Sequence, residues 1–228
     1  MIQDGTSPPE TSSSLAPATE ETLLFNPVHA RNIINFLKIV GRLKHTLRTG
    51  WVDYKVSHPE SIASHMYRMA IISMLTKNQP GIDTVRCIKM SVIHDIAESI
   101  AGDITPHAGV SKEEKYKLES DGIELLKKTL LNGVEPDTKE NQEFIQTVNE
   151  MLDLWHEYEE AKTPEAIIMK DIDKFDMVLQ ALEYETDQNM ELPTFYQTTR
   201  GAFQTDMFKT IMKELYVQKD ELDQQRKK

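Results

Sequence analysis

Residues 83–100 read DTVRCIKMSVIHDIAESI, and this stretch carries the strongest signal for both the fold and the chemistry of the chain. We predict one helix over it, because a glycine just past its end is a typical stop. Within it, His94 and Glu98 are one turn apart, and Asp95 and Glu98 are three residues apart, so a helix would place all three on one side. An imidazole beside two carboxylates suits a divalent cation. The alternative is the exposed polar face of an amphipathic helix.

Helix signals recur on both sides of this stretch, whereas the alternating pattern of strands is missing. No internal repeat of 20 to 50 residues is found. The predicted fold class is therefore all-α, an irregular helical bundle around one core. Three of the other expected helices begin after Asn26-Pro27, after Pro59 and at a capping box of Ser111 and Glu114. The remaining three are expected over about 138–161, from Thr163-Pro164 to about Glu185, and over about 204–224.

The composition suggests two regions along the 228 residues. Residues 1–22 are rich in Ser, Thr, Pro and Glu, and such a segment buries too little apolar surface to order itself, so we expect a disordered tail. Residues 23–228 have the length of a single domain.

Charge and cysteine content restrict the partners and the compartment. The formal net charge of −11 repels long nucleic acid, although a small phosphorylated metabolite can still be held by a few cations or a metal. The single cysteine excludes an internal disulfide. No apolar run approaches the roughly 20 residues of a membrane span, and no secretory signal precedes the first helix. We expect a cytoplasmic protein, possibly also nuclear, that does not bind membranes.

Two polar residues fall on apolar helix faces outside the first stretch. His65 shares a stripe with Ile62, Met69 and Ile72, so its side chain is expected to point inward. A lone histidine there is more often a hydrogen-bonded core residue. Asp173 lies along an apolar face of the helix that starts at Pro164, where a carboxylate is costly unless it is paired or bound to a metal.

The order His65, His94-Asp95, Asp173 is the four-ligand pattern of the HD superfamily of metal-dependent phosphohydrolases. From about Ile33 to Tyr216 the chain resembles the family of HD domain-containing protein 2 and its more distant relatives, the bacterial 5'-deoxynucleotidases. The markers of this resemblance are Arg48-Thr49-Gly50-Trp51, Pro59-Glu60-Ser61, His65-Met66-Tyr67-Arg68-Met69-Ala70, His94-Asp95-Ile96-Ala97-Glu98, Gly102-Asp103-Ile104-Thr105-Pro106 and Lys170-Asp171-Ile172-Asp173-Lys174.

The resemblance implies a homodimer that hydrolyses 2'-deoxynucleoside 5'-monophosphates to a deoxynucleoside and phosphate. It implies a divalent cation, Mn²⁺, Co²⁺ or Mg²⁺, with room for a water and a phosphate oxygen. The ligands implied for this cation are His65, His94, Asp95 and Asp173. The residues implied for a second cation, or for orienting the attacking water, are Glu98, Asp103 and the backbone carbonyl of Ile104.

The catalytic roles follow from the chemistry of a phosphate monoester, an anion that resists nucleophiles. A bound cation neutralises it and lowers the pKa of a coordinated water. Glu98 is a reasonable proton acceptor or donor, acting with the metal ligand Asp95. Arg48 and Lys55 are the candidates for clamping the remaining phosphate oxygens.

Trp51 is the candidate for recognising the sugar. It matches a tryptophan that lies beside the sugar in the bacterial relatives, where a bulky ring would exclude a 2'-hydroxyl. A core aromatic is the alternative. The bacterial enzymes place an arginine directly before this tryptophan, and this chain has Gly50 there, so Arg48 is expected to reach the same phosphate from two residues back.

Other functions stay open at this stage. One is an HD hydrolase acting on a nucleoside triphosphate, a cyclic dinucleotide or an alarmone. Alarmone hydrolases carry Glu-Asp where this chain has Glu98-Ser99, and the Gly-Tyr-Pro element of cyclic dinucleotide enzymes is absent. Another is a non-catalytic sensor that binds a metal or nucleotide and regulates a partner.

Overall fold

The computed structural model describes residues 26–105 and 108–227, and these residues form helices without a β-sheet. The all-α prediction is confirmed. The predicted tail, residues 1–22, lies outside the described residues, and so do residues 23–25 of the predicted domain. The helices are α1 (Pro27–Val40), α2 (Thr49–Asp53), α3 (Ile62–Met74), α4 (Thr84–Ser91), α5 (Glu98–Ala101), α6 (Lys112–Leu130), α7 (Lys139–Glu160), α8 (Pro164–Gln188), α9 (Pro193–Thr199) and α10 (Asp206–Arg226).

The long helices begin where the capping residues predict. The Asn26 side chain accepts a hydrogen bond from the Val28 N–H at the start of α1. Ser111 and Glu114 form the expected capping box of α6, and Thr163 caps α8. These side chains satisfy N–H groups that have no partner within the helix.

The expected continuous helix over 83–100 is wrong, because α4 ends at Ser91 and successive turns separate it from α5. In those turns the N–H groups of Ile96 and Glu98 bond to carbonyls three residues back. The buried His94 ring needs an acceptor for Nδ1, and it lies 2.9 Å from the Ser91 carbonyl oxygen. In a continuous helix that carbonyl would accept the Asp95 N–H instead.

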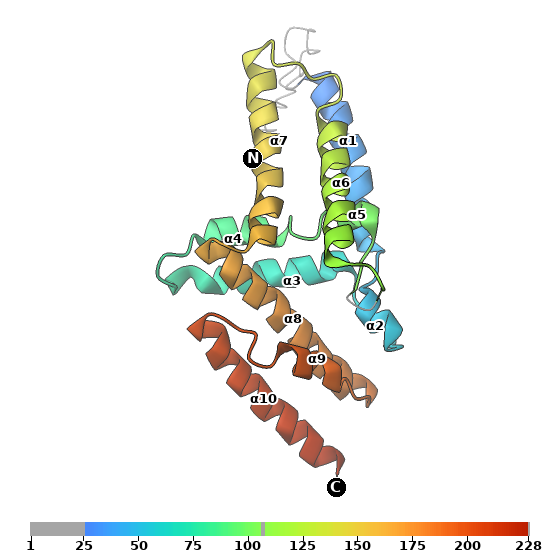
Figure 1. Cartoon of the computed structure of the whole chain (residues 1–228), viewed down its shortest axis with the longest axis vertical. Helices are drawn as coiled ribbons and strands as arrows, with labels where there is room; N and C mark the ends of the chain where they lie inside the picture. Colours follow the sequence, from blue (N-terminus) through green and yellow to red (C-terminus); the bar gives the residue numbers. More distant parts are fainter. Residues whose placement is uncertain (1–25, 106–107, 228) are drawn as a thin grey trace, which may run out of the picture.

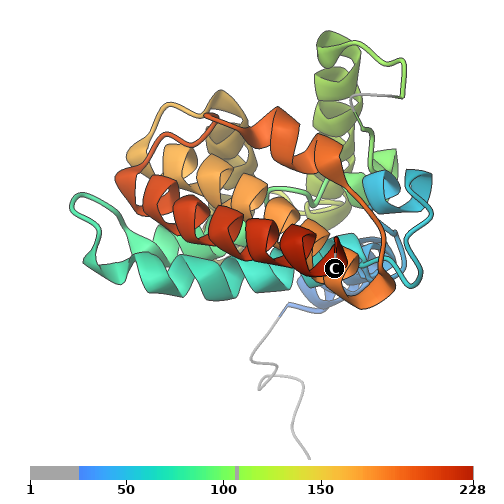
Figure 2. The same cartoon turned by 90° about the horizontal axis from the view of Figure 1, so that it is seen from below.

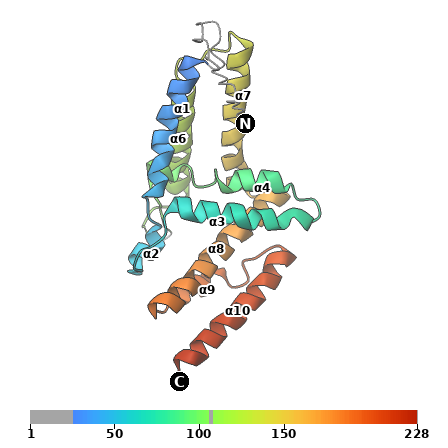
Figure 3. The same ribbon diagram turned by 180° about the vertical axis from the view of Figure 1, so that it is seen from behind.

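The helices form two groups on either side of a central pair. Figure 1 shows α1, α6 and α7 standing on one side of α3 and α4, with α8, α9 and α10 on the other. The reverse view in Figure 3 agrees, and α8 packs against both α3 and α4. Seen from below in Figure 2, α10 lies along the outside of α8.

One main hydrophobic core joins these helices within the described residues. It includes Met69 of α3, Met90 of α4, Trp155 of α7 and Ile172 of α8, all buried. The same part of the chain contains no helix that is both long and apolar enough to cross a membrane. The core therefore fixes α3, α4 and α8 relative to one another around the candidate site.

Two short helices, α2 and α9, are absent from the sequence-based prediction. Each is too short to show an apolar periodicity of its own. They lie close together, since Tyr54 at the end of α2 donates a hydrogen bond to Thr194 of α9 (2.8 Å). Both helices contribute to the wall of the candidate site.

Candidate active site

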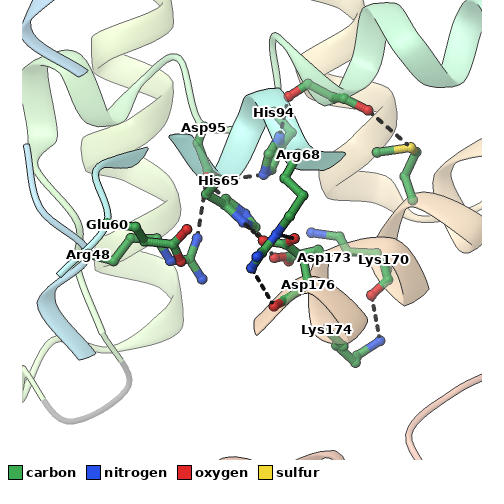
Figure 4. Close-up of polar contacts among 12 residues, drawn as sticks. Arg48, Glu60, His65, Arg68, His94, Asp95, Lys170, Asp173, Lys174 and Asp176 are labelled. Atoms are coloured by element: carbon green, nitrogen blue, oxygen red, sulfur yellow. Dashed lines mark hydrogen bonds and ion pairs between the residues drawn. The ribbon is translucent and has the colours of Figure 1, made fainter. Parts of the chain in front are cut away.

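Side chains from three parts of the fold meet at the crossing of α3, α8 and the turns after α4 (Figure 4). His65 Nε2 lies 3.3 Å from Asp173 Oδ1, and ligand atoms of His65, His94 and Asp173 all lie within 4.8 Å of one another. Asp95 Oδ2 lies 3.1 Å from His94 Nε2 and 3.8 Å from His65 Nε2. The structure thus brings together all four residues expected to bind the first cation.

This cluster fits a divalent cation. Both histidines are buried, and the Nε2 atom of each lacks a hydrogen-bond partner of acceptable geometry among the described residues. A buried polar nitrogen without a partner is costly, and such groups in native proteins usually have an explanation. Two imidazole nitrogens facing two carboxylates form a donor set that binds divalent cations well.

Asp176 holds the His65 ring from the side opposite to the cluster. It is 0% exposed, and its Oδ2 accepts a hydrogen bond from His65 Nδ1 at 2.7 Å. Arg68 Nε donates to the other oxygen of Asp176, and Arg68 Nη1 donates to Glu183 Oε2 at 2.7 Å. With its proton fixed on Nδ1, the His65 ring turns the Nε2 lone pair toward the cluster. Asp176 was not predicted from the sequence, although its position three residues after Asp173 was a usable signal.

Asp176→Asn should lower the affinity for a divalent cation by about 10- to 100-fold, the usual effect of removing such a partner of a ligating histidine. The asparagine keeps the size of the side chain but loses the charge that orients and polarises the ring. Titration calorimetry with Mn²⁺ measures the affinity. The control is Glu183→Gln, which alters the exposed end of the same network and should leave the affinity unchanged. Equal affinities for Asp176→Asn and the parent protein would contradict this role.

The carboxyl groups of the cluster differ in their tendency to ionise. Burial opposes the charge of Asp95, but His94, His65 and Arg48 hold its pKa well below the usual range. Glu98 is buried, its Oε2 has no partner among the described residues, and burial and the charges of Asp95 and Asp103 raise its pKa well above normal. Glu98 is therefore the acid in the cluster suited to hold and transfer a proton near neutral pH.

Cation affinity should fall as the pH is lowered, because a cation must replace a proton on His65. Burial and Arg48 disfavour the charged ring, but the neighbouring carboxylates of Asp173 and Asp176 outweigh them and raise the pKa of His65 to about 9. Below that pH the ring is protonated, so each unit of decrease should weaken binding about tenfold near neutrality. Calorimetry in two buffers of different ionisation enthalpy would detect about one proton released per cation bound. An affinity that is constant between neutral and mildly alkaline pH would contradict the competition.

A cavity of about 570 Å³ opens beside the cluster, a volume within the range of about 300–1,000 Å³ that is typical of small-molecule sites. Its lining falls into two groups. The charged group consists of Arg48, Asp53, Asp95, Glu98, Asp103, Lys115 and Asp173. The remaining lining is mostly aromatic or hydroxyl-bearing and includes Trp51, Tyr54, Ile104, Thr105, Met177, Thr194, Phe195 and Thr198.

Arg48 is well placed to hold an anion in this cavity. Its Nη1 lies 3.7 Å from Asp95 Oδ2, and its side chain is largely but not fully covered. Burial opposes the charge, but Asp173, Asp95, Glu60 and Asp103 outweigh it and keep the pKa of Arg48 above its ordinary value. The guanidinium is thus always charged and presents a planar donor group toward the cavity.

Asp103 and Ile104 also line the cavity, as expected for residues near a second cation. Asp103 Oδ2 accepts the Thr49 N–H at 2.5 Å, and the Asp103 carbonyl accepts the Thr49 hydroxyl at 2.8 Å. These bonds tie the segment after α5 to the start of α2. They leave the second carboxylate oxygen of Asp103 for other contacts.

The expected phosphate contact of Lys55 is not supported. Lys55 follows α2 in a left-handed turn with φ 60°, is exposed, and is not among the residues that line the cavity. The lysine that does line it is Lys115 of α6, whose Nζ lies 3.4 Å from Glu119 Oε1. Sequence reasoning missed Lys115, because the packing of α6 against α1, α5 and α7 brings it to the cavity.

Trp51 is both a cavity-lining residue and a core aromatic, the two interpretations that the sequence left open. It lines the cavity, yet it is only 1% exposed, as a core residue would be. Its indole N–H donates to Glu60 Oε1 at 3.0 Å, and its ring lies against Tyr184 and Phe195, with centroid distances of 5.2 and 4.3 Å. Any effect of Trp51 on a ligand is therefore exerted together with the ring of Phe195.

A family model described as the HD domain matches residues 40–221, a range that contains the cluster and both groups of lining residues. The chain belongs to the HD domain family. The HD domain implies dependence on a divalent cation, in agreement with the donor set described above.

Similar proteins include enzymes named 5'-deoxynucleotidase. HDDC2 of Dictyostelium discoideum is 41% identical over 196 residues, which cover 81% of this chain and 96% of that protein. The 5'-deoxynucleotidase hdd1 of Schizosaccharomyces pombe is 47% identical over 166 residues, covering 73% and 79%. Among solved structures, HD domain-containing protein YGK1 superposes with a TM-score of 0.63 at 28% identity, covering 85% of this chain and 88% of that one. The PH0347 protein from Pyrococcus horikoshii OT3 gives a TM-score of 0.60 at 30% identity, covering 81% and 97%.

Proposed function

We propose that this chain is a metal-dependent 5'-deoxynucleotidase that hydrolyses 2'-deoxynucleoside 5'-monophosphates to a deoxynucleoside and phosphate. The observation that carries the proposal is the buried His–Asp cluster at a cavity that also holds an arginine and a wall of aromatic rings. Relatives over most of the chain are named for this activity. The enzyme is thus a phosphoric monoester hydrolase.

The roles of the residues follow from their positions. A divalent cation held by His65, His94, Asp95 and Asp173 would supply charge neutralisation and a more acidic water. Arg48 binds the phosphate oxygens with its planar guanidinium. As the water oxygen bonds to phosphorus and the bond to the 5'-oxygen breaks, Glu98 donates its proton to that leaving oxygen and later regains one from the water.

The identity of the cation and the assembly belong to the proposal as well. A set of two imidazoles and two carboxylates suits Mn²⁺ or Co²⁺, and Mg²⁺ is the third candidate. Glu98, Asp103 and the Ile104 carbonyl are the candidates for a second cation or for orienting the water, because all three line the cavity beside the cluster. We also propose a homodimer, on the basis of the family resemblance.

The experiment that tests the function compares phosphate release from dAMP and AMP, with Mn²⁺, Co²⁺ or Mg²⁺ and with a chelator. We expect metal-dependent release from dAMP, abolished by the chelator, and much slower release from AMP, because the Trp51 ring, packed against Phe195, restricts the space beside the sugar. Equal release from both substrates would contradict the sugar selectivity. Release from neither, with release from dGTP instead, would contradict the monophosphatase activity.

A further inference from the structure

We propose that Phe195 of α9 is the surface on which the nucleobase of the substrate stacks, with Tyr54 beside it. This inference rests on the proposed function and deepens it, because it assigns the aromatic part of the cavity to the base. The sequence-based assignment covered the phosphate and the sugar only. A flat aromatic ring is the ligand chemistry that such a wall recognises.

Phe195 is the ring of this wall that remains accessible. It lines the cavity and is partly exposed, whereas Trp51 behind it is almost fully buried. The Phe195 ring stacks on Trp51 with an interplanar angle of 29° and is tilted at 58° to Tyr54, at a centroid distance of 5.2 Å. Nucleobases stack on aromatic side chains with useful affinity, since every base presents a π-face.

The position of the wall relative to the metal cluster matches the shape of a nucleotide. Asp173 and Met177 both line the cavity and are four residues apart on α8, so the apolar lining begins about one helical turn, ~5.4 Å, from the cluster. A phosphate held at Arg48 and the cluster would place the sugar over this interval. The base would then reach α9.

Hydrogen bonds hold α9 in place against the rest of the fold. Glu185 of α8 is 0% exposed, and its two oxygens accept the Leu192 N–H at 2.6 Å and the Tyr196 hydroxyl at 2.9 Å. Lys219 of α10 pairs with the same carboxylate at 3.0 Å. Phe195 is therefore presented by a fixed element, and a ligand that stacks on it does not have to order the wall first.

Two hydroxyl groups beside Phe195, those of Tyr54 and Thr198, are engaged within the wall. The Tyr54 hydroxyl donates to the Thr194 hydroxyl at 2.8 Å, and the Thr198 hydroxyl donates to the Thr194 carbonyl at 2.9 Å. These two donors are thus already used, and beside them the Phe195 ring offers an aromatic face to a base.

The test compares Phe195→Leu with the wild-type protein on two substrates, dAMP and 2-deoxyribose 5-phosphate, which lacks the base. We expect Phe195→Leu to raise KM for dAMP by roughly 10- to 100-fold, in line with the loss of one stacked base, and to change KM for the sugar phosphate little. Phe195→Tyr keeps the ring and should behave like the wild type. Phe175→Leu is the matched control, since Phe175 packs on Phe208 of α10 and does not line the cavity.

Equal losses on both substrates in Phe195→Leu, or an unchanged KM for dAMP, would overturn the proposal. Calorimetric titration with deoxyadenosine reads the base contact without turnover, and Phe195→Leu should weaken this binding by a similar factor. If the wild type hydrolysed neither substrate but bound deoxyadenosine more tightly than Phe195→Leu did, the proposed activity would be wrong and the base contact would be supported. A wild type that binds no deoxyadenosine would overturn the base contact itself.

Discussion

Replacing His94 with alanine is expected to reduce phosphate release from dAMP by about a thousandfold or more, because the several kcal/mol that a bound cation contributes would be lost. His94 is buried, and its Nε2 lies 3.1 Å from Asp95 Oδ2 but has no hydrogen-bond partner among the described residues. Without this imidazole the cluster keeps one ring and two carboxylates. We therefore expect cation affinity and turnover to fall together.

The measurement pairs calorimetric titration of Mn²⁺ with phosphate release, and circular dichroism checks that the helices remain. His94→Gln provides a second variant, because it fills more of the buried space if the alanine protein is unstable. His45→Ala is the control, since His45 is an exposed histidine at the end of a short 3-10 turn. Metal-dependent turnover of dAMP at the wild-type rate by a folded His94→Ala protein would rule out the proposed site.

Replacing Arg48 with methionine is expected to lower kcat/KM for dAMP by about 100- to 1,000-fold, the usual cost of removing a donor that stabilises developing negative charge. The affinity for a divalent cation, in contrast, should stay the same or rise. Arg48 lies among the carboxylates of Glu60, Asp95, Asp103 and Asp173, and its removal leaves the cluster more negative. A divalent cation would then bind at least as tightly as before.

Measuring both turnover and cation affinity distinguishes two roles of Arg48, binding the phosphate and holding Asp95 in place. Turnover and Mn²⁺ affinity are measured on the same samples, and Arg86→Met is the control, because Arg86 pairs with Glu157 away from the cavity. Arg48→Lys keeps the charge but loses the planar donor pair, so we expect only partial recovery of activity. Parallel loss of cation affinity and activity in Arg48→Met would mean that Arg48 holds Asp95 in place and does not act on the phosphate.

The parts of the fold that sequence could predict are those encoded locally. The N-caps at Asn26, Ser111 and Thr163 mark helix starts that the structure has at the same places. The break after Ser91 could not be predicted, because it depends on a bond between the His94 ring and a backbone carbonyl that is available only once the ring is buried. The short helices α2 and α9 are likewise stabilised by each other and by the core.

The candidate site shows the same division. The order of the four cluster residues was readable because each stands in a recognisable local motif, and the structure brings all four together. Lys55 lies outside the cavity lining, because the left-handed turn after α2, which no local pattern in the sequence predicts, leaves this side chain exposed. Lys115 and Phe195 escaped prediction because each reaches the site through packing between segments far apart in the sequence, whereas Asp176 was missed although it lies one turn after Asp173 on α8.

The last turn of α10 has a practical consequence for anyone who purifies this protein. Arg226, close to the C-terminus, donates to the carbonyl oxygens of Met190, at 2.8 Å, and of Glu185, and so fastens the segment that leads into α9. Removing Arg226 by truncation, or fusing an affinity tag directly after it, would weaken these two hydrogen bonds and so the attachment of α9, although Arg226 itself does not line the cavity. Kinetic constants measured on such a preparation would reflect an α9 that Arg226 no longer holds in place. Assays should therefore use the protein without a C-terminal tag.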